Sequence, residues 1–179
     1  NTNSGEMTGI QVAVKGENTG ESVIIVTETG DRFTAEQLNL KMDQQTLGNK
    51  LNYTVSDSIY HVDTMKVKEE IPMHTVVVPR GKTFELVLSD GTFVLLNPES
   101  ELTYPVKFDS TSVREVTLRG EGYFEVTKSS NRFAVNTGNM KLQVYGTTFN
   151  VISREGLPDE AVLVKGVVGI TPKNSPEME

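Results

Sequence analysis

One short segment of this chain gathers the residue types of a hydrolytic active site. The run SDSIYHVD at residues 56–63 contains two serines, a histidine and two aspartates. A catalytic triad is defined by its geometry, and its nucleophile usually lies at a strained turn flanked by glycines. No glycine stands beside Ser56 or Ser58. We therefore interpret the segment as a polar loop leading into a strand, with an enzyme built around His61 and Asp63 as a rival hypothesis.

Metal binding is the second kind of chemistry to consider. A zinc site without cysteine needs both histidines of the chain, His61 and His74, together with a carboxylate. The two lie 13 residues apart on different predicted strands and form no H-x-x-x-H pattern. We predict no metal site, and we expect His74 to cap or flank the strand that contains Val76–Val78.

Glycines and paired carboxylates complete the search for catalytic groups. A phosphate loop needs a helix after its glycines, but a predicted strand follows Gly120-Glu121-Gly122, which favours a tight turn or bulge. Glycosidases need two carboxylates in a cleft, usually with aromatic residues for sugar stacking. The pairs Glu99 with Glu101 and Glu69 with Glu70 are candidates, but the chain has no tryptophan. We predict no catalytic residue and no cofactor.

Charge and composition exclude further classes of function. The formal net charge of −7 argues against binding nucleic acid or an anionic membrane through a basic face. The chain has no cysteine, which excludes thiol catalysis and disulfides. No apolar run approaches the roughly 20 residues that span a bilayer. Because no enzyme motif stands out, we interpret the chain as a soluble domain whose output is binding.

Period-two alternation of apolar residues dominates the chain and predicts many short strands with one buried face. The runs are Ile10/Val12/Val14, Leu38/Leu40/Met42, Leu51/Tyr53/Val55, Phe84/Leu86/Leu88, Phe124/Val126, Phe133/Val135, Met140/Leu142/Val144 and Phe149/Val151. Because of this period, we expect Ala35–Leu47 to form a strand rather than a helix. We also expect Tyr104, Tyr123, Phe124 and Phe149 to fill the core.

Turn residues separate these runs at short intervals, and Asp90-Gly91 between two apolar runs is a strong hairpin signal. Pro79-Arg80-Gly81 and Asn97-Pro98 mark further turns. The sequence therefore predicts an all-β fold of many short, mostly antiparallel strands. We favour two facing sheets with solenoid-like winding, of the β-helix or jelly-roll kind.

An ordered set of motifs over Ile71–Thr171 resembles the FecR-like anti-sigma factors, in the form common in Bacteroidetes. The motifs are Pro79-Arg80-Gly81, Leu88-Ser89-Asp90-Gly91-Thr92, Leu96-Asn97, Ser100, Tyr104-Pro105, Arg114-Glu115-Val116, Gly120-Glu121-Gly122-Tyr123-Phe124-Glu125-Val126, Gly146-Thr147, Phe149-Asn150-Val151 and Val164-Lys165-Gly166. Each motif is weak alone, whereas the ordered set is specific. Most of these residues look structural, so the resemblance assigns no partner-binding residue.

The resemblance implies the periplasmic sensor domain of a single-pass inner-membrane anti-sigma factor. Such proteins contact the signalling domain of an outer-membrane TonB-dependent transporter. They hold an extracytoplasmic-function sigma factor through a cytoplasmic region and so link nutrient uptake to transcription regulation. We expect this signal transduction to work by protein–protein contact, without catalysis, a cofactor or nucleic acid.

The resemblance also suggests how the chain is organised. We predict a β-rich N-terminal segment of the periplasmic region over residues 8–70 and the FecR-like β-domain over 71–172. Residues 1–7 and 173–179 are predicted to be flexible ends. The cytoplasmic region, the membrane helix and a small C-terminal α/β module common in the family do not occur in this sequence. We therefore expect the chain to be a piece of a longer protein.

A carbohydrate-binding β-module is the main alternative function. Such modules usually display aromatic side chains on one exposed face, and the lack of tryptophan disfavours this hypothesis. A clear hit on a glycan array would reverse the ranking.

Overall fold

The computed structural model describes residues 10–16, 21–34, 41–42, 50–53, 71–109 and 111–173. Within them the chain forms strands joined by turns and contains no helix, which confirms the predicted all-β fold. In chain order the strands are β1 Ile10–Gly16, β2 Ile24–Val26, β3 Arg32–Thr34, β4 Lys41–Met42, β5 Lys50–Tyr53, β6 Met73–Val78, β7 Lys82–Val87, β8 Phe93–Leu96, β9 Ser100–Pro105, β10 Arg114–Glu125, β11 Phe133–Asn136, β12 Met140–Val144, β13 Thr148–Ser153, β14 Glu160–Lys165 and β15 Gly169–Pro172.

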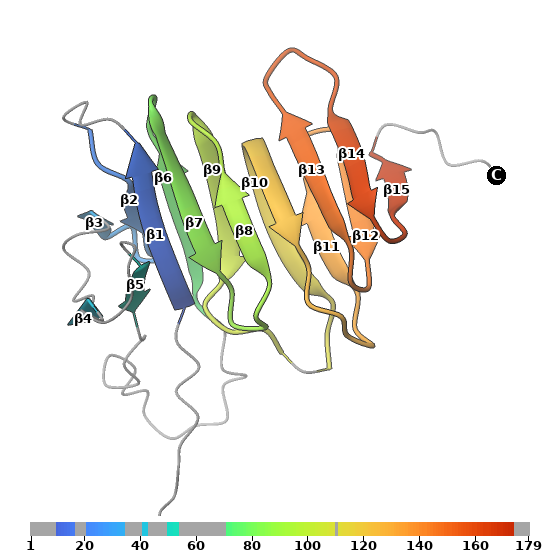
Figure 1. Cartoon of the computed structure of the whole chain (residues 1–179), viewed down its shortest axis with the longest axis horizontal. Helices are drawn as coiled ribbons and strands as arrows, with labels where there is room; N and C mark the ends of the chain where they lie inside the picture. The colour runs from blue at the N-terminus through green and yellow to red at the C-terminus, as the bar shows by residue number, and fades with distance from the viewer. Residues whose placement is uncertain are drawn as a thin grey trace, which may run out of the picture.

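The strands form two sheets that share β10. Sheet A has the order β4-β5-β1-β7-β8-β10-β13-β14. Sheet B has the order β3-β2-β6-β9-β10-β11-β12-β15. Neighbours run antiparallel except β10 and β11, which are parallel. Figure 1 shows the two layers one behind the other, with β14 and β15 together at one end. Two facing sheets were predicted, and the structure confirms them.

Apolar side chains that alternate along the strands fill the space between the sheets. Phe84 and Leu86 of β7 face inward from sheet A, and Leu102 and Tyr104 of β9 face inward from sheet B; all four are fully buried. Burial of each such side chain stabilises the fold by about 1.5–3 kcal/mol. The alternation read from the sequence therefore identifies the core, because each strand of a sandwich buries one face.

Strand β10 passes from one sheet to the other without a break. Its first half pairs with β9 and β11 in sheet B, and its second half pairs with β8 and β13 in sheet A. The change occurs at Gly120, whose φ is +92°, a conformation that L side chains rarely adopt. A Cβ there would lie 2.4 Å from Oγ of Ser100. The prediction of a tight turn or bulge at Gly120-Glu121-Gly122 is therefore wrong: β10 runs through these residues without a register shift against β13, and the glycines let one strand serve both sheets.

The chain crosses between sheets after β8 in a connection that is fastened to β10. Asn97 donates its backbone N–H to the carbonyl oxygen of Glu121 at 3.0 Å. The Oγ of Ser100 accepts the backbone N–H of Glu121 at 2.8 Å. Glu99 between them has a φ of +60°, the left-handed region. The predicted turn at Asn97-Pro98 is thus confirmed.

Two other predicted turns are also present. β7 and β8 form an antiparallel hairpin around Asp90-Gly91, in which the N–H of Gly91 donates to the carbonyl oxygen of Leu88 at 2.9 Å. Pro79-Arg80-Gly81 instead carries the chain from β6 in sheet B to β7 in sheet A. From β6 onward the chain visits the two sheets in turn, and solenoid-like winding stays a prediction.

Several sequence predictions need correction or fall outside the described residues. Tyr123 lies on the outer face of β10, where its hydroxyl donates to Oε1 of Glu125 at 3.0 Å, so its assignment to the core is wrong. Of the strand predicted within Ala35–Leu47, the structure describes β4 alone. The segments 56–63 and 69–70 and the predicted flexible ends, except residue 173, lie outside the described residues.

The N-terminal strands continue both sheets of the later segment. β1 pairs with β7 in sheet A, and β2 pairs with β6 in sheet B. The division between residues 8–70 and 71–172 stays a prediction.

Candidate protein-interaction surface

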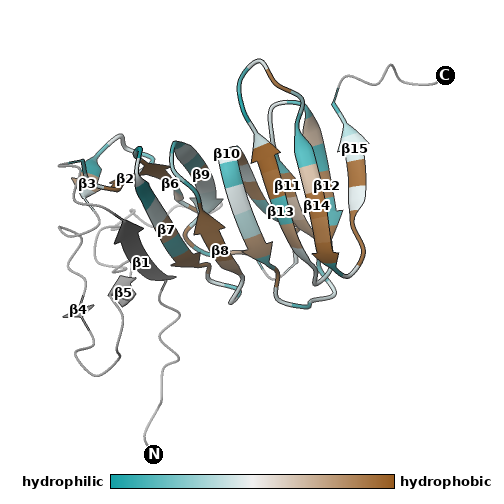
Figure 2. Cartoon of the chain, turned by 45° about the horizontal axis from the view of Figure 1, so that its top comes forward, coloured by the Kyte–Doolittle hydropathy of each residue, from teal (hydrophilic) through white to brown (hydrophobic). Residues whose placement is uncertain are grey.

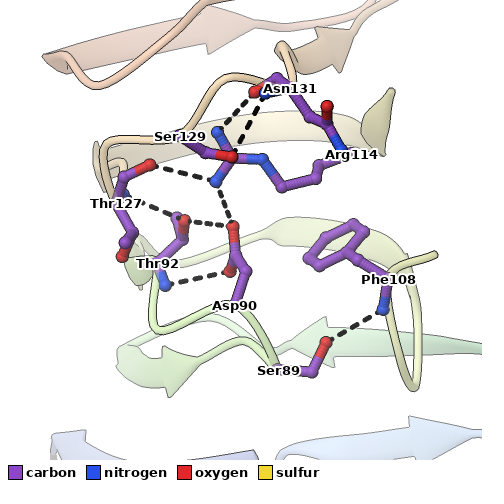
Figure 3. Close-up of polar contacts among 8 residues, drawn as sticks. All are labelled: Ser89, Asp90, Thr92, Phe108, Arg114, Thr127, Ser129 and Asn131. Carbon is purple, nitrogen blue, oxygen red and sulfur yellow. Dashed lines mark hydrogen bonds and ion pairs between the residues drawn. The ribbon is translucent and has the colours of Figure 1, made fainter. Parts of the chain in front are cut away.

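The motif Leu88-Ser89-Asp90-Gly91-Thr92 forms a turn that is closed by its own side chains. Asp90 accepts the backbone N–H of Thr92 on Oδ1 at 2.9 Å and the Thr92 hydroxyl on Oδ2 at 2.7 Å (Figure 3). The hydroxyl oxygen of Ser89 accepts the backbone N–H of Phe108 at 3.1 Å. Aspartate side chains often close turns in this way. The polar groups of the motif are therefore occupied in holding the hairpin.

Arg114, at the start of β10, completes this network from the other side. Its side chain is only 4% exposed, and its Nη1 lies 2.6 Å from Oδ2 of Asp90. Nη1 also donates to the carbonyl oxygen of Thr127 at 3.0 Å, and Nη2 to that of Asn131 at 2.9 Å (Figure 3). The guanidinium carbon lies 5.5 Å from the centre of the Phe133 ring. One arginine thus joins the β7–β8 turn, β10 and the segment before β11.

This network has the chemistry of a structural ion pair. Charges removed from water are costly unless they pair and find further hydrogen bonds, which Arg114 and Asp90 both do. In the described part of the chain, Nε of Arg114 is the buried side-chain nitrogen that has no hydrogen-bond partner. Thr92 extends the network, because its hydroxyl oxygen accepts the backbone N–H of Thr127 at 3.2 Å. The signature residues therefore position strands.

His74 lies inside β6 rather than at its flank, which corrects the sequence prediction. Its side chain points into the core and is 6% exposed, with its ring 6.3 Å from the ring of Tyr104 in an edge-to-face arrangement. Burial lowers the pKa of His74, which favours the neutral imidazole at pH 7. Among the described residues no group of histidine, aspartate and glutamate could hold a metal ion. Glu99 is exposed at its turn, as expected for a solvated loop.

The C-terminal end of the sandwich exposes apolar side chains, in contrast to the network around Asp90. β14 is the last strand of sheet A and β15 the last strand of sheet B. Figure 2 shows an apolar band across β15 at this end of the molecule. We call the following residues the C-terminal edge surface: Val162 (55% exposed), Leu163 (45%), Val164 (62%), Val167 (81%) and Ile170 (49%).

The interior of the sandwich is uncovered at this end. Leu163 stands opposite Phe149 on the inner face of sheet A, and Ile170 stands opposite Leu142 on the inner face of sheet B. Phe149 and Leu142 are at most 1% exposed, whereas their neighbours are about half exposed. Such a concentration of exposed apolar residues beside unpaired strand edges is typical of protein-interaction sites.

Hydrogen bonds from sheet B fix where β14 begins. Asp159, just before β14, accepts the hydroxyl of Thr137 and the backbone N–H of Asn139, the latter at 3.1 Å. Burial raises the pKa of Asp159, but hydrogen bonds from Thr137, Ser153 and Asn139 outweigh this and lower it. Lys173 continues the same contact, because its N–H donates to the carbonyl oxygen of Asn139 at 2.8 Å. These contacts thus hold the start of β14 and the end of β15 to the same turn between β11 and β12.

The profile of one protein family, described as FecR protein, matches residues 74–169. This span is more than half of the 179 residues. The chain belongs to the FecR family. FecR proteins form a regulatory family, and the predicted resemblance is confirmed.

Solved structures agree with this assignment. Two chains from Parabacteroides distasonis ATCC 8503, each described as a candidate anti-sigma factor, are similar to this FecR chain. The first has 28% identity and a TM-score of 0.55, over 57% of this chain and 49% of the other. The second has 30% identity and a TM-score of 0.53, over 56% and 48%. The FecR chain thus spans about half the length of these relatives. No curated protein matches it.

The C-terminal edge surface lies at the boundary of the FecR match, which ends at Gly169, the first residue of β15. Sequence analysis identified no partner-binding residue in this region. The apolar run Ala161–Val164 does not single this region out, because Val23–Val26 and Phe93–Leu96 are apolar runs of the same length. Among the described residues, no helix has the length and apolar character needed to cross a membrane.

Proposed function

We propose that this FecR domain belongs to the periplasmic sensor region of a transmembrane anti-sigma factor. It relays a signal from an outer-membrane TonB-dependent transporter to an extracytoplasmic-function sigma factor by protein–protein contact. The family match over residues 74–169 carries this proposal, and the two similar chains described as anti-sigma factors support it.

The distribution of polar groups supports relay by contact rather than by catalysis. Among the described residues the most deeply buried ion pair is Arg114 with Asp90, which is enclosed by backbone groups and the Phe133 ring. Such a network stabilises a domain, and the charges of Arg114 and Asp90 are occupied within it. The sensor is a β-sandwich, and its output is a change in what binds to its surface.

The C-terminal edge surface is the part of the sensor that we assign to protein contact. Apolar side chains that are half exposed or more supply the hydrophobic core of an interface, and free strand edges supply hydrogen-bonding groups. Val167 is the most exposed of them, at 81%, and lies between the two edge strands. In the intact periplasmic region this end therefore meets the transporter's signalling domain.

Calorimetry with the intact periplasmic region tests the proposal. We expect it to bind the N-terminal signalling domain of the cognate transporter, and to ignore the same domain of a non-cognate transporter. Val167→Asp should weaken binding about tenfold or more, which corresponds to about 1.4 kcal/mol. Val113→Asp is the matched control, because Val113 is also an exposed valine, at 46%, but lies before β10. Absence of binding to the cognate domain would refute the proposed function.

A further inference from the structure

Strand β14 offers a free edge for pairing. It pairs with β13 on one side, and no described strand pairs with its other side. Its sequence is Glu-Ala-Val-Leu-Val-Lys, with opposite charges at its two ends and apolar residues between them. An edge strand presents unpaired N–H and C=O groups to any chain that can lie beside it. The question is which strand fits this edge.

The register of β14 on β13 decides which of its side chains share a face. Glu160 stands opposite Ile152, and Val162 stands opposite Asn150, both on the outer face of sheet A. The register then shifts, so that Leu163 stands opposite Phe149 and Lys165 opposite Thr148. The shift makes Val164 an extra residue, as in a β-bulge. In consequence Lys165 falls on the same outer face as Glu160 and Val162.

This arrangement is complementary to itself. If a second copy runs antiparallel beside β14, with the two-fold axis at Val162, each Glu160 faces Lys165 of the other copy. Val162 then faces its own counterpart on the outer face, and Ala161 faces Leu163 on the inner face. Opposite charges and apolar pairs directly across two antiparallel strands both stabilise the pairing. Without the bulge, Lys165 would fall on the inner face and the charges would not meet.

The neighbouring edge strand lacks this property. β15 consists of Gly169, Ile170, Thr171 and Pro172, which carry no charged side chain. Pro172 has no backbone N–H to donate, and proline at a strand edge opposes pairing. Of the two edges at this end, β14 is therefore the one whose chemistry selects a copy of itself.

We propose that two copies of this chain pair through β14, antiparallel and two-fold symmetric about Val162, so that their A sheets become continuous. An isologous contact of this kind closes on itself and gives a dimer. The inference follows from the register and charges of β14, and because β14 also contributes to the C-terminal edge surface, self-pairing and the transporter contact proposed above compete for this strand.

Sedimentation velocity of the 179-residue chain tests the dimer across about a hundredfold range of protomer concentration. We expect a reversible monomer–dimer equilibrium. Val162→Lys places two like charges across the axis and should raise the dissociation constant about tenfold or more. Val113→Lys adds the same charge away from β14 and should leave the equilibrium unchanged. Circular dichroism and thermal unfolding establish that both variants are folded.

A charge exchange tests the register independently. Glu160→Lys alone and Lys165→Glu alone should each weaken self-association, because like charges then face each other. The double variant restores the opposite pairs and should dimerise again. An equimolar mixture of the two single variants should form a heterodimer in preference to either homodimer, since every facing pair is then complementary.

Three results would overturn the proposal. A chain that stays monomeric throughout the concentration range would show that the β14 edge does not pair with a second copy. Equal effects of Val162→Lys and Val113→Lys would place the dimer contact elsewhere. A double charge variant that fails to regain association, while remaining folded, would contradict the register.

Discussion

The β7–β8 turn and the β14–β15 edge belong to one FecR domain, yet they use their side chains in opposite ways. At the turn, Asp90 and Arg114 are 11% and 4% exposed, and their charges satisfy each other and the nearby backbone. At the edge, Val164 and Val167 are 62% and 81% exposed, although valine is the kind of residue a core takes up. The turn thus buries charged residues, whereas the edge exposes apolar residues.

This difference explains why a family can be recognised from residues that do not carry its output. A buried ion pair requires specific side chains at specific positions, so it leaves a readable motif. An apolar contact surface requires only area and shape, which many residues supply. The predictions below test whether the turn is indeed structural and the edge indeed free, and they are ordered by the size of the expected effect.

Replacement of Arg114 by methionine should give the largest loss of stability. The change leaves Asp90 and two backbone carbonyl groups without their partner, so we expect the free energy of unfolding to fall by about 4 kcal/mol. Urea unfolding followed by circular dichroism measures it. Arg119→Met is the control, because Arg119 and Glu155 form a pair that is 67% and 90% exposed. A similar loss in both variants would mean that the Asp90 network contributes no more than a surface pair.

Truncation of two leucines compares the core with the edge directly. Leu142 is fully buried, so Leu142→Ala should lower the free energy of unfolding by about 3 kcal/mol. Leu163→Ala should cost about 1 kcal/mol or less, because Leu163 faces the same interior but is 45% exposed. Chemical unfolding at low protomer concentration measures both without a contribution from self-association. Equal losses would show that the C-terminal end is packed and not open.

Gly120→Ala tests the crossing of β10 between the sheets. The alanine must adopt a φ near +92° and place its Cβ 2.8 Å from the carbonyl oxygen of Glu99, so we expect a loss of about 2 kcal/mol. In Gly138→Ala the new Cβ meets nothing within 4 Å, and stability should be unchanged or slightly higher. Thermal unfolding of the two variants checks this. If Gly120→Ala leaves the melting temperature unchanged, the positive φ at the crossing is not the reason for the glycine.

Acid should weaken the attachment of β14 through Asp159, the smallest of these effects. Hydrogen bonds lower the pKa of Asp159 in the folded state, so its ionised form stabilises the fold above the unfolded pKa of about 4. That stability is lost as the pH falls through the lower, folded pKa. Asp159→Asn should therefore flatten the dependence of the urea midpoint on pH below about 4. An unchanged acid dependence in the variant would contradict the role of this carboxylate.

The sequence predicts the local features of the fold well, because they depend on neighbouring residues. Alternation locates the buried face of β7 and β9, and Asp90-Gly91 predicts its hairpin. The ion pair between Asp90 and Arg114 joins residues 24 apart, and no local pattern announces it. The outward position of Tyr123 was missed although period two requires it, because Tyr123 cannot share the inner face of β10 with its neighbour Phe124.

The candidate surface was harder to predict than the core. A run such as Ala161–Val164 is typical of a strand buried on both faces, so its sequence alone suggests the interior. Only the topology shows that β14 ends its sheet and that nothing in the described part of the chain covers it. The bulge places the charged residues at the two ends of β14 on the same face, and the sequence does not reveal the bulge.

Amide hydrogen exchange tests the central claim most directly, that the edge makes the contacts while the turn holds the fold. The intact periplasmic region would be measured alone and with the transporter's signalling domain, at a concentration where it is monomeric. We predict slow exchange in β8 and β10 in both states and the largest slowing on binding in β14 and β15. Slowing confined to the β7–β8 turn, with β14 and β15 unchanged, would contradict the account.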